Sequence, residues 1–508
     1  MTKIKDGLKC RLKGITACIA LGVMLTTTAQ AQDVRIALSG GFDRLDPSVT
    51  GNASDLNVLS QIYETLLTLD SKTGELKPKL AESFEATSPT VWTFHLRDGV
   101  TFSNGTPLTA EDVKFSIERI LDPSLGSTHA SQLSSIKEVR AIDRLTVEIE
   151  TKKPDPVLLR RMQPIGGTGR VYIVSKSHVE GRNPADVASD PIGTGPFKLA
   201  SWDRGRQLTL VRNETYWGDA PAVDGAVYTS IPENSTRVNA LLTGEVDVIQ
   251  SLPITDVERV KASERAHVVS SPNGLVHVLQ LDSRHPPFDD IEVRKAFVHA
   301  IDIKGIVEGL LGEYGRVLAV PLSPNALQFD TELAPYTYDP ALSKKLLAGK
   351  SISLKTFTSD GRYVGDRDIY QIINSQLKQV GFDINAQTLE WGRFVNMMSQ
   401  KSGGPFYITG WDFGEGDASK MNSILSSGAA FSVTADATYD SLVAQAAQEL
   451  DEARRTKLWH DIQTYVHDQY LVGAVWQSSA LYGFSKNLDW EPRFGENMSL
   501  SEFHFVNK

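Results

Sequence analysis

The chain contains almost no cysteine. Of its 508 residues only Cys10 and Cys18 are cysteines, and both lie near the start of the sequence. Residues 19–508 therefore hold no disulfide framework, no catalytic thiol and no cysteine-based zinc or iron–sulfur site.

Basic residues are also fewer than acidic residues. The sequence has 52 lysines and arginines against 62 aspartates and glutamates, which gives a formal net charge of −10. This balance argues against a nucleic-acid partner, because nucleic-acid binders usually carry a basic face. A composition of 41% hydrophobic and 22% charged residues excludes a fibrous or mostly disordered chain. The length favours about three domains.

The common motifs of hydrolytic and nucleotide chemistry are missing. The sequence has no G-x-S-x-G elbow, no H-E-x-x-H, no Walker A loop and no G-x-G-x-x-G. Gly193-Thr194-Gly195 lacks a third glycine, and Pro196 removes a backbone donor, so we interpret this segment as a turn or crossover. We expect no resident metal and no cofactor.

The first 31 residues have the order of a secretory signal peptide. Lysines and an arginine between Lys3 and Lys13 precede an apolar run, Ile15–Leu25, and a small-x-small site, Ala29–Ala31. The run is too short to cross a bilayer, which takes about 20 helical residues. The sequence predicts cleavage after Ala31 and export to the periplasm. The alternative is an uncleaved membrane anchor.

The rest of the chain has a mixed α/β pattern. Alternating or short apolar runs predict strands at 34–38, 91–96 and 145–149. Helical spacing predicts helices at 56–69, 291–311 and 366–380, and Gly381 is placed to end the last. Thr109 and Asp112 predict a capped helix start. No repeat or long linker separates these segments, so the domains must be closely packed or interleaved.

An acidic loop stands out near residue 415. Asp412, Glu415 and Asp417 lie between Trp411 and Lys420, and glycines are interspersed among them. Paired carboxylates can hydrolyse glycosides, so a secreted hydrolase is one interpretation. The glycines favour instead a loop whose backbone approaches a neighbour closely, with the acids binding a positively charged ligand. A simple solvated loop is the third possibility.

Several segments together resemble a known family. They include Leu76–Phe84, Trp92–Phe102, Asn104–Val113, Pro191–Phe197 and Arg212–Trp217, and further short matches continue to Gly410-Trp411. Their order and spacing resemble the peptide/nickel/opine class, family 5, of extracytoplasmic solute-binding proteins of bacterial ABC importers. The resemblance extends over nearly the whole chain after residue 31.

The resemblance implies an α/β fold with two lobes, a hinge between them and an additional third domain. The expected first lobe is discontinuous and comprises residues 32–58, 186–274 and 475–508. The additional domain is expected at 59–185 and the second lobe at 275–474. The resemblance further implies a monomer that is not an enzyme and that encloses a solute between its lobes. The partners would be the transmembrane permease subunits and their cytoplasmic ATPases.

The resemblance also suggests ligand-binding residues. Peptide-binding members place an aspartate three residues after the tryptophan equivalent to Trp411, where it pairs with the peptide's amino terminus. This sequence has Gly414 there, so we expect Asp412, Glu415 or Asp417 to take that role, with Asp417 as the first candidate and Asp412 as the second.

An arginine before the helix at 366–380 receives the ligand carboxylate in dipeptide-type members. Arg362 fits this place, with Arg367 and Arg393 as rivals. Trp391 and Trp411 are candidate apolar walls. We expect a peptide ligand; the alternatives are opines, glutathione-like conjugates, nickel chelates and sugars.

Overall fold

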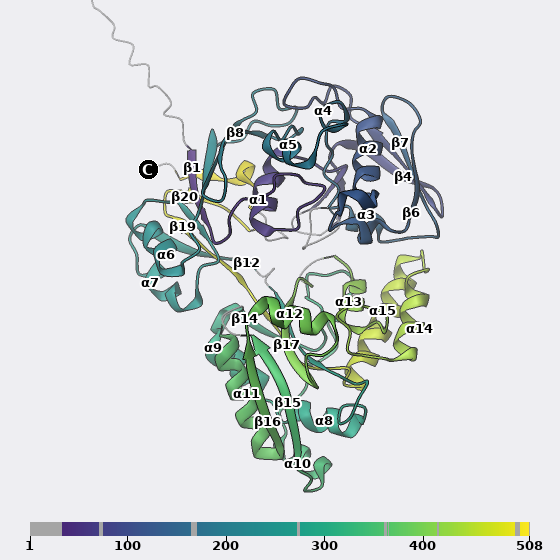
Figure 1. Ribbon diagram of the computed structural model, residues 1–508, viewed down its shortest axis with the longest axis vertical. Helices are drawn as coiled ribbons and strands as arrows, with labels where there is room; N and C mark the ends of the chain where they lie inside the picture. Colours follow the sequence, from purple (N-terminus) through teal and green to yellow (C-terminus); the bar gives the residue numbers. More distant parts are fainter. Residues whose placement is uncertain are drawn as a thin grey trace, which may run out of the picture.

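Two lobes and a third domain make up the protein. The computed structural model describes residues 33–70, 75–163, 170–271, 275–359, 363, 365–413, 416–492 and 498–506. The first lobe and the third domain lie side by side in the upper half of the molecule, and the second lobe lies below them (Figure 1). Each of the three parts is built on its own sheet. The expected fold class is therefore confirmed.

The first lobe contains a seven-stranded sheet in the order β12-β19-β11-β1-β10-β9-β8. Its strands are β1 (Asp33–Leu38), β8 (Phe197–Asp203), β9 (Gln207–Arg212), β10 (Gly225–Ser230), β11 (Val248–Gln250), β12 (Ala266–Ser271) and β19 (Ala480–Ser485). The helices of this lobe are α1 (Ala53–Ile62), α4 (Lys176–Val179), α5 (Pro184–Ser189), α6 (Asn234–Thr243) and α7 (Val257–Lys261).

β1 lies in the interior of this sheet, parallel to β10 and β11. Ile36 packs with Leu59 of α1 on one face, and Ala37 packs with Leu241 of α6 on the other. Helices therefore cover both faces of the strand, which explains why its sequence is nearly continuously apolar.

The third domain is a four-stranded antiparallel sheet in the order β4-β5-β7-β6. Its elements are β2 (Leu67–Leu69), β3 (Leu76–Pro78), β4 (Ala81–Ser88), β5 (Val91–Leu96), α2 (Ala110–Leu121), β6 (Ile136–Ala141), β7 (Thr146–Thr151) and α3 (Leu158–Arg161). The predicted start of α2 is confirmed, because Thr109 and Asp112 form a capping box. The buried Val113 and Ile117 of α2 lie in one core with Val147 and Ile149 of β7.

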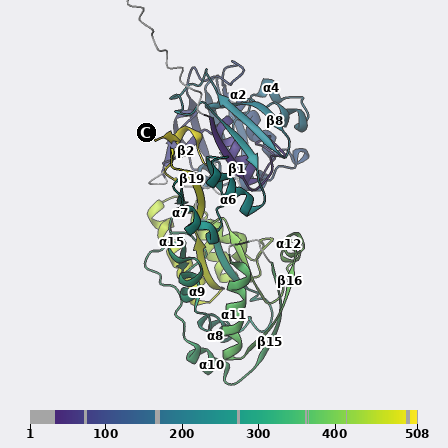
Figure 2. The same cartoon turned by 90° about the vertical axis from the view of Figure 1, so that its left-hand side faces the viewer.

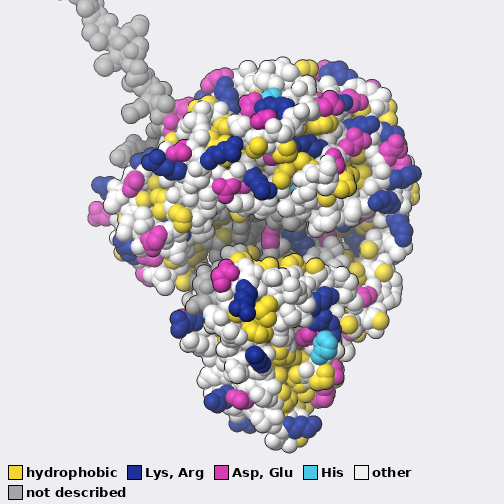
Figure 3. All heavy atoms as spheres, viewed as in Figure 1, with side chains coloured by type: hydrophobic (Ala, Val, Ile, Leu, Met, Phe, Trp, Pro, Cys, Tyr) yellow, Lys and Arg dark blue, Asp and Glu magenta, His cyan; other side chains and the backbone are white. Residues whose placement is uncertain are grey.

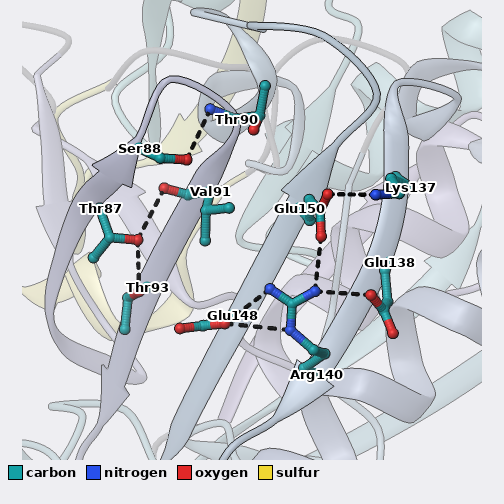
Figure 4. A network of polar contacts seen from close by, with 10 residues as sticks. All are labelled: Thr87, Ser88, Thr90, Val91, Thr93, Lys137, Glu138, Arg140, Glu148 and Glu150. Carbon is teal, nitrogen blue, oxygen red and sulfur yellow. Dashed lines mark hydrogen bonds and ion pairs between the residues drawn. The ribbon is translucent and has the colours of Figure 1, made fainter.

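Strands β6 and β7 of this sheet carry a network of charges (Figure 4). Arg140 on β6 forms ion pairs with Glu138, Glu148 and Glu150 at 2.8, 2.9 and 2.8 Å. Hydrogen bonds to these three carboxylates raise the pKa of Arg140 above its ordinary value. The network offsets the repulsion among glutamates on neighbouring strands.

The second lobe contains the sheet β14-β18-β13-β17 and a separate parallel pair, β15 and β16. Its strands are β13 (Val276–Leu281), β14 (Gly315–Leu318), β15 (Ile352–Ser359), β16 (Phe382–Leu389), β17 (Phe406–Trp411) and β18 (Val472–Ser478). Its helices are α8 (Ile291–His299), α9 (Ile303–Leu310), α10 (Pro340–Leu347), α11 (Asp366–Val380), α12 (Trp391–Ser399), α13 (Asn422–Leu425), α14 (Ala437–Ala446) and α15 (Glu452–Asp468). Figure 2 shows β15 and β16 along the outer edge of this lobe.

Helix α11 agrees with the sequence prediction at both ends, and Gly381 follows it at φ 121°. Two other predicted helices differ from the structure. The pattern at 291–311 forms two helices, because Asp302 accepts a hydrogen bond from the amide of Gly305 and starts a new one. In the segment predicted as a helix at 56–69, the helix ends at Ile62, and residues 67–69 form a strand, β2, that pairs with β3.

Two chain segments connect the lobes. One leads from β12 to β13 and the other from β18 to β19 (Figure 1). β18 extends to Ser478 in the second lobe's sheet and β19 begins at Ala480 in the first, so this crossing lies at Ser479. The division that the family resemblance implied placed it at 474–475. The domain boundaries remain a prediction.

The chain passes close to the end of α1 at Gly193 and Gly195. The amide of Gly195 donates to the carbonyl oxygen of Ile62 at 2.8 Å. A Cβ on Gly193 would lie 2.0 Å from that oxygen. The segment therefore serves as a close crossing against the end of α1.

Candidate functional site

A cavity of about 610 Å³ lies between the third domain and the second lobe. The space-filling view shows the hollow between the upper and lower parts of the molecule (Figure 3). Segments around α3 form its upper wall, and the rest is formed by the end of β17, the loop after it, α13, the end of α14 and α15. The charged residues that line it are Asp155, Arg160, Arg161, Asp412, Asp417, Lys420 and Arg455.

Trp411 lines the cavity at the end of β17. Its indole Nε1 donates a hydrogen bond of 2.6 Å to the hydroxyl of Thr409. The ring stacks on Phe413 with centroids 5.8 Å apart and meets Phe431 edge-on at 5.4 Å. These contacts fix the ring, so a rigid aromatic surface faces the cavity.

The acidic loop after β17 also reaches the cavity. Asp412 lines it, and its carboxylate has no hydrogen bond or ion pair among the described residues. The carbonyl oxygen of Asp412 accepts a 3.0 Å hydrogen bond from Lys420. Asp417 is only 4% exposed, and its carboxylate accepts a 2.7 Å hydrogen bond from the amide of Ser419. Asp412 is therefore the acid that is better placed to accept a ligand ammonium.

The upper wall supplies two arginines from α3. Arg161 forms an ion pair with Asp155, which also lines the cavity. Burial lowers the pKa of Arg160, while the carboxylates of Asp417 and Glu452 act in the opposite direction. Arg160 thus faces charges of the second lobe across the cavity.

Helix α15 supplies Arg455 and Trp459 to the lower wall. Arg455 is 8% exposed and Trp459 2%. Among the described residues, Nε of Arg455 has no hydrogen-bond partner. The cavity therefore combines aromatic rings with positive charge from both sides.

Three of the sequence-predicted residues line the cavity, namely Trp411, Asp412 and Asp417. Arg362 and Glu415 lie outside the described residues. Trp391 lies at the start of α12 and is not part of the cavity wall. Its ring meets Tyr363 edge-on at 5.8 Å, and Tyr363 in turn meets His277 at 5.1 Å.

The sequence analysis missed Arg160, Lys420, Arg455 and Trp459. Arg160 belongs to a four-residue helix of a different domain, and Arg455 lies on a helix with many other charges. No spacing in the sequence relates the two, since only the packing of the lobes brings them to one cavity. Of these four residues, only Lys420 could have been selected from the sequence, because it lies close to the acidic loop along the chain.

Other kinds of site find no support in the part of the chain that the structure describes. It contains no cluster of three or more histidine, cysteine, aspartate or glutamate side chains suited to a metal ion. Among the same residues, no helix is both long and apolar enough to cross a membrane.

Comparisons with known proteins agree with this architecture. The family model described as "Bacterial extracellular solute-binding proteins, family 5 Middle" matches residues 75–464, more than half of the chain. The chain is 25% identical over 464 residues to the glutathione-binding protein GsiB of Escherichia coli O157:H7, covering 88% of this chain and 89% of the relative.

Solved structures show the same fold. The ABC transporter-associated periplasmic binding protein DppA from Helicobacter pylori, in complex with the peptide STSA, matches with a TM-score of 0.78 and 23% identity, covering 94% of this chain and 98% of that one. The binding protein MoaA from A. tumefacien R10, in complex with mannopinic acid, matches with a TM-score of 0.76 and 24% identity, covering 94% and 100%.

Proposed function

Because the chain belongs to family 5 of the bacterial extracellular solute-binding proteins of ABC importers, we propose that it captures a peptide or a peptide-like zwitterion between its lobes. The observation that carries this proposal is the cavity between the third domain and the second lobe. Its walls combine Asp412, whose carboxylate makes no ion pair with the described residues, with the guanidinium groups of Arg160 and Arg455 and the ring of Trp411. A zwitterion presents the complementary charges.

The physical argument is one of desolvation. Enclosing an ammonium and a carboxylate removes water from both, which costs several kcal/mol per ion unless each is paired. Asp412 is our first candidate for the ammonium. Asp417 is second, because its carboxylate already caps the 3-10 helix Ala418–Met421 by accepting from the amide of Ser419. Glu415 and, for the ligand carboxylate, Arg362 remain candidates from the sequence.

Relatives support the ligand class without naming the ligand. The relatives described above bind glutathione, a peptide and mannopinic acid, and each of these carries carboxylate. Peptides are our main proposal and conjugates of amino acids are the second. No catalytic step is part of the proposal, and no cofactor is needed for it.

Ligand capture would couple to closure of the lobes. Two chain segments join them, at Ser479 and between β12 and β13, so rotation of one lobe against the other at these segments is the simplest motion. A ligand that contacts both walls of the cavity stabilises the closed arrangement. We further propose that residues 1–31 are removed on export to the periplasm and that the protein acts as a monomer. There it would deliver solute to a permease driven by cytoplasmic ATPases.

Native mass spectrometry of protein purified from the periplasm without denaturation tests this proposal. We expect a retained ligand of small mass that carries both amine and carboxylate. Adding that ligand to protein that was unfolded and refolded should lower the radius of gyration in small-angle scattering and raise the melting temperature.

A neutral ligand, or a sugar without ionic groups, would contradict the zwitterion proposal. Release of a hydrolysed product from peptide or glycoside mixtures would instead favour an enzyme. N-terminal sequencing of the exported protein should begin at Gln32.

A further inference from the structure

The hydroxyl of Thr409 holds the indole of Trp411 from inside the second lobe. Thr409 and Trp411 lie two residues apart on β17, so their side chains leave the same face of the strand. The indole Nε1 donates to the hydroxyl oxygen at 2.6 Å. Thr409 is 1% exposed and does not line the cavity, whereas Trp411 does. Thr409 therefore acts on the cavity wall through the ring.

Gln280 holds the same hydroxyl from the neighbouring strand. In the pairing of β13 with β17, Val278 lies opposite Thr409, and Gln280 lies two residues farther along β13 on the same face. Its side-chain Nε2 donates to the hydroxyl oxygen of Thr409 at 2.9 Å. A threonine hydroxyl has two acceptor positions, and the N–H groups of Gln280 and Trp411 occupy both. The oxygen is thus fixed from two sides.

Glutamine is a costly residue at this place in the core. All six residues of β13 are buried, and Gln280 is 2% exposed. Among the described residues, its Oε1 has no hydrogen-bond partner. A buried acceptor without a partner lowers stability, and an apolar side chain of similar size would avoid that cost. A side chain that lowers stability while it orients a wall of the cavity is typical of a functional position.

We propose that Thr409 and Gln280 are positioning residues for ligand capture, which fix the ring of Trp411 in the orientation that forms the cavity wall. This inference rests on the proposed capture of a peptide and adds residues that contribute to it without touching the ligand. Phe413 and Phe431 pack against the ring, and the hydrogen bond adds a directional constraint that packing lacks. A ring that is ordered before binding loses little freedom on binding, which raises affinity.

The free protein gives the first test, because the indole N–H of Trp411 is itself an NMR probe. Its resonance is assigned by its loss in Trp411→Phe. Exchange of this proton with water should be roughly two- to tenfold faster in Thr409→Val than in wild type, the effect of one neutral hydrogen bond. Thr409→Ser keeps the hydroxyl and should restore slow exchange. Gln280→Met should give an intermediate rate without lowering the melting temperature, since it also removes the unsatisfied Oε1.

A second test measures capture. Native mass spectrometry against random dipeptide and tripeptide mixtures selects the member that binds wild type most tightly, and calorimetric titration then uses that peptide. Thr409→Val should weaken its binding by roughly two- to tenfold. In Trp411→Phe, which has no indole N–H, the same substitution should change affinity by less than about twofold, because residues that act through one another are not additive.

The matched control is Thr93→Val in the sheet of the third domain. Thr93 is 7% exposed, and its hydroxyl lies 3.3 Å from that of Thr87 (Figure 4). The control removes a buried hydroxyl from another strand, so exchange at Trp411 and affinity for the peptide should keep their wild-type values. Circular dichroism shows whether each variant is folded.

The outcomes separate this inference from the proposed function. If folded Thr409→Val keeps wild-type exchange at Trp411 or wild-type affinity, or weakens binding equally with and without the indole N–H, the inference is wrong while peptide capture stands. If no member of either mixture binds wild type, the peptide proposal fails. The exchange rates then decide the inference by themselves.

Discussion

The ring of Tyr363 lies directly against the backbone of Gly410. A Cβ on residue 410 would lie 2.7 Å from Cε1 of that ring, and the tyrosine hydroxyl is 3.5 Å from the carbonyl oxygen of Gly410. Gly410 immediately precedes Trp411, which lines the cavity. The contact therefore positions the end of β17, where the candidate site begins.

Gly410→Ala should destabilise the protein by about 1–3 kcal/mol, the usual effect of overpacking, because the ring of Tyr363 has to move. It should also weaken ligand binding by displacing Trp411. Urea unfolding and calorimetry measure the two effects. The matched control is Gly428→Ala, since nothing lies within 4 Å of a Cβ there. Equal stability of the two variants would show that the ring adapts freely.

The two candidate tryptophans should behave differently. Trp411→Ala removes a ring that lines the cavity, so we expect the affinity for the retained ligand to fall by about 2 kcal/mol, roughly thirtyfold. Trp391→Ala should change affinity less than about threefold, because Trp391 packs on Tyr363 and Phe394 outside the cavity wall. Calorimetric titration distinguishes them. Similar losses for both would support the sequence-based assignment of both rings to the ligand.

An ion pair between Asp46 and Arg119 joins the first lobe to the third domain. The guanidinium donates two hydrogen bonds to the carboxylate, at 2.8 and 2.5 Å, and the side chains are 2% and 10% exposed. Asp46→Ala leaves a buried cation, so unfolding free energy should fall by about 3–5 kcal/mol.

The control for this prediction is the exposed pair of Arg144 and Asp98. Arg144→Gln should leave the urea midpoint nearly unchanged, since exposed pairs contribute little. If Asp46→Ala is equally mild, water or a rearranged acceptor must satisfy Arg119.

His129 should make stability depend on pH. The ring is fully buried, and Nε2 lies 2.9 Å from the carbonyl oxygen of Thr50, so this nitrogen bears a proton and donates it. Burial lowers the pKa of His129, and the charge of Arg170 acts in the same direction. The unfolded chain then binds a proton more readily than the folded one. This contribution to stability is complete above about pH 6.5, the ordinary histidine value, and is lost as the pH falls toward the folded-state pKa.

The measurement is the free energy of unfolding in urea at pH 8, 6.5 and 5. His129→Gln should flatten the decline between pH 6.5 and 5 relative to wild type. At pH 8 histidine is neutral in both the folded and the unfolded state. The difference in unfolding free energy between His129→Gln and wild type at this pH therefore measures the loss of packing alone. An unchanged decline in the variant would mean that other groups carry the acid sensitivity.

Sequence reasoning succeeded where the signal is local. Capping at Thr109 and the apolar stripe ended by Gly381 predicted the start of α2 and the bounds of α11. It failed at 291–311, because a side chain such as Asp302 can start a new helix without interrupting the apolar periodicity. Trp411 and Asp412 could be selected because aromatic and acidic residues cluster around glycines in one short segment.

By itself, the sequence determined the α/β class, the family resemblance and the acidic loop beside Trp411. Each of these depends on short patterns of residues that follow one another along the chain. Only the tertiary structure decided that Arg160 and Arg455 face one cavity and that Trp391 lies outside it. Arg160 and Arg455 belong to different domains, and their encounter depends on the packing of whole lobes. The Coulomb energy between two charges depends on their distance and surroundings in space, and neither quantity can be read from separation along the chain.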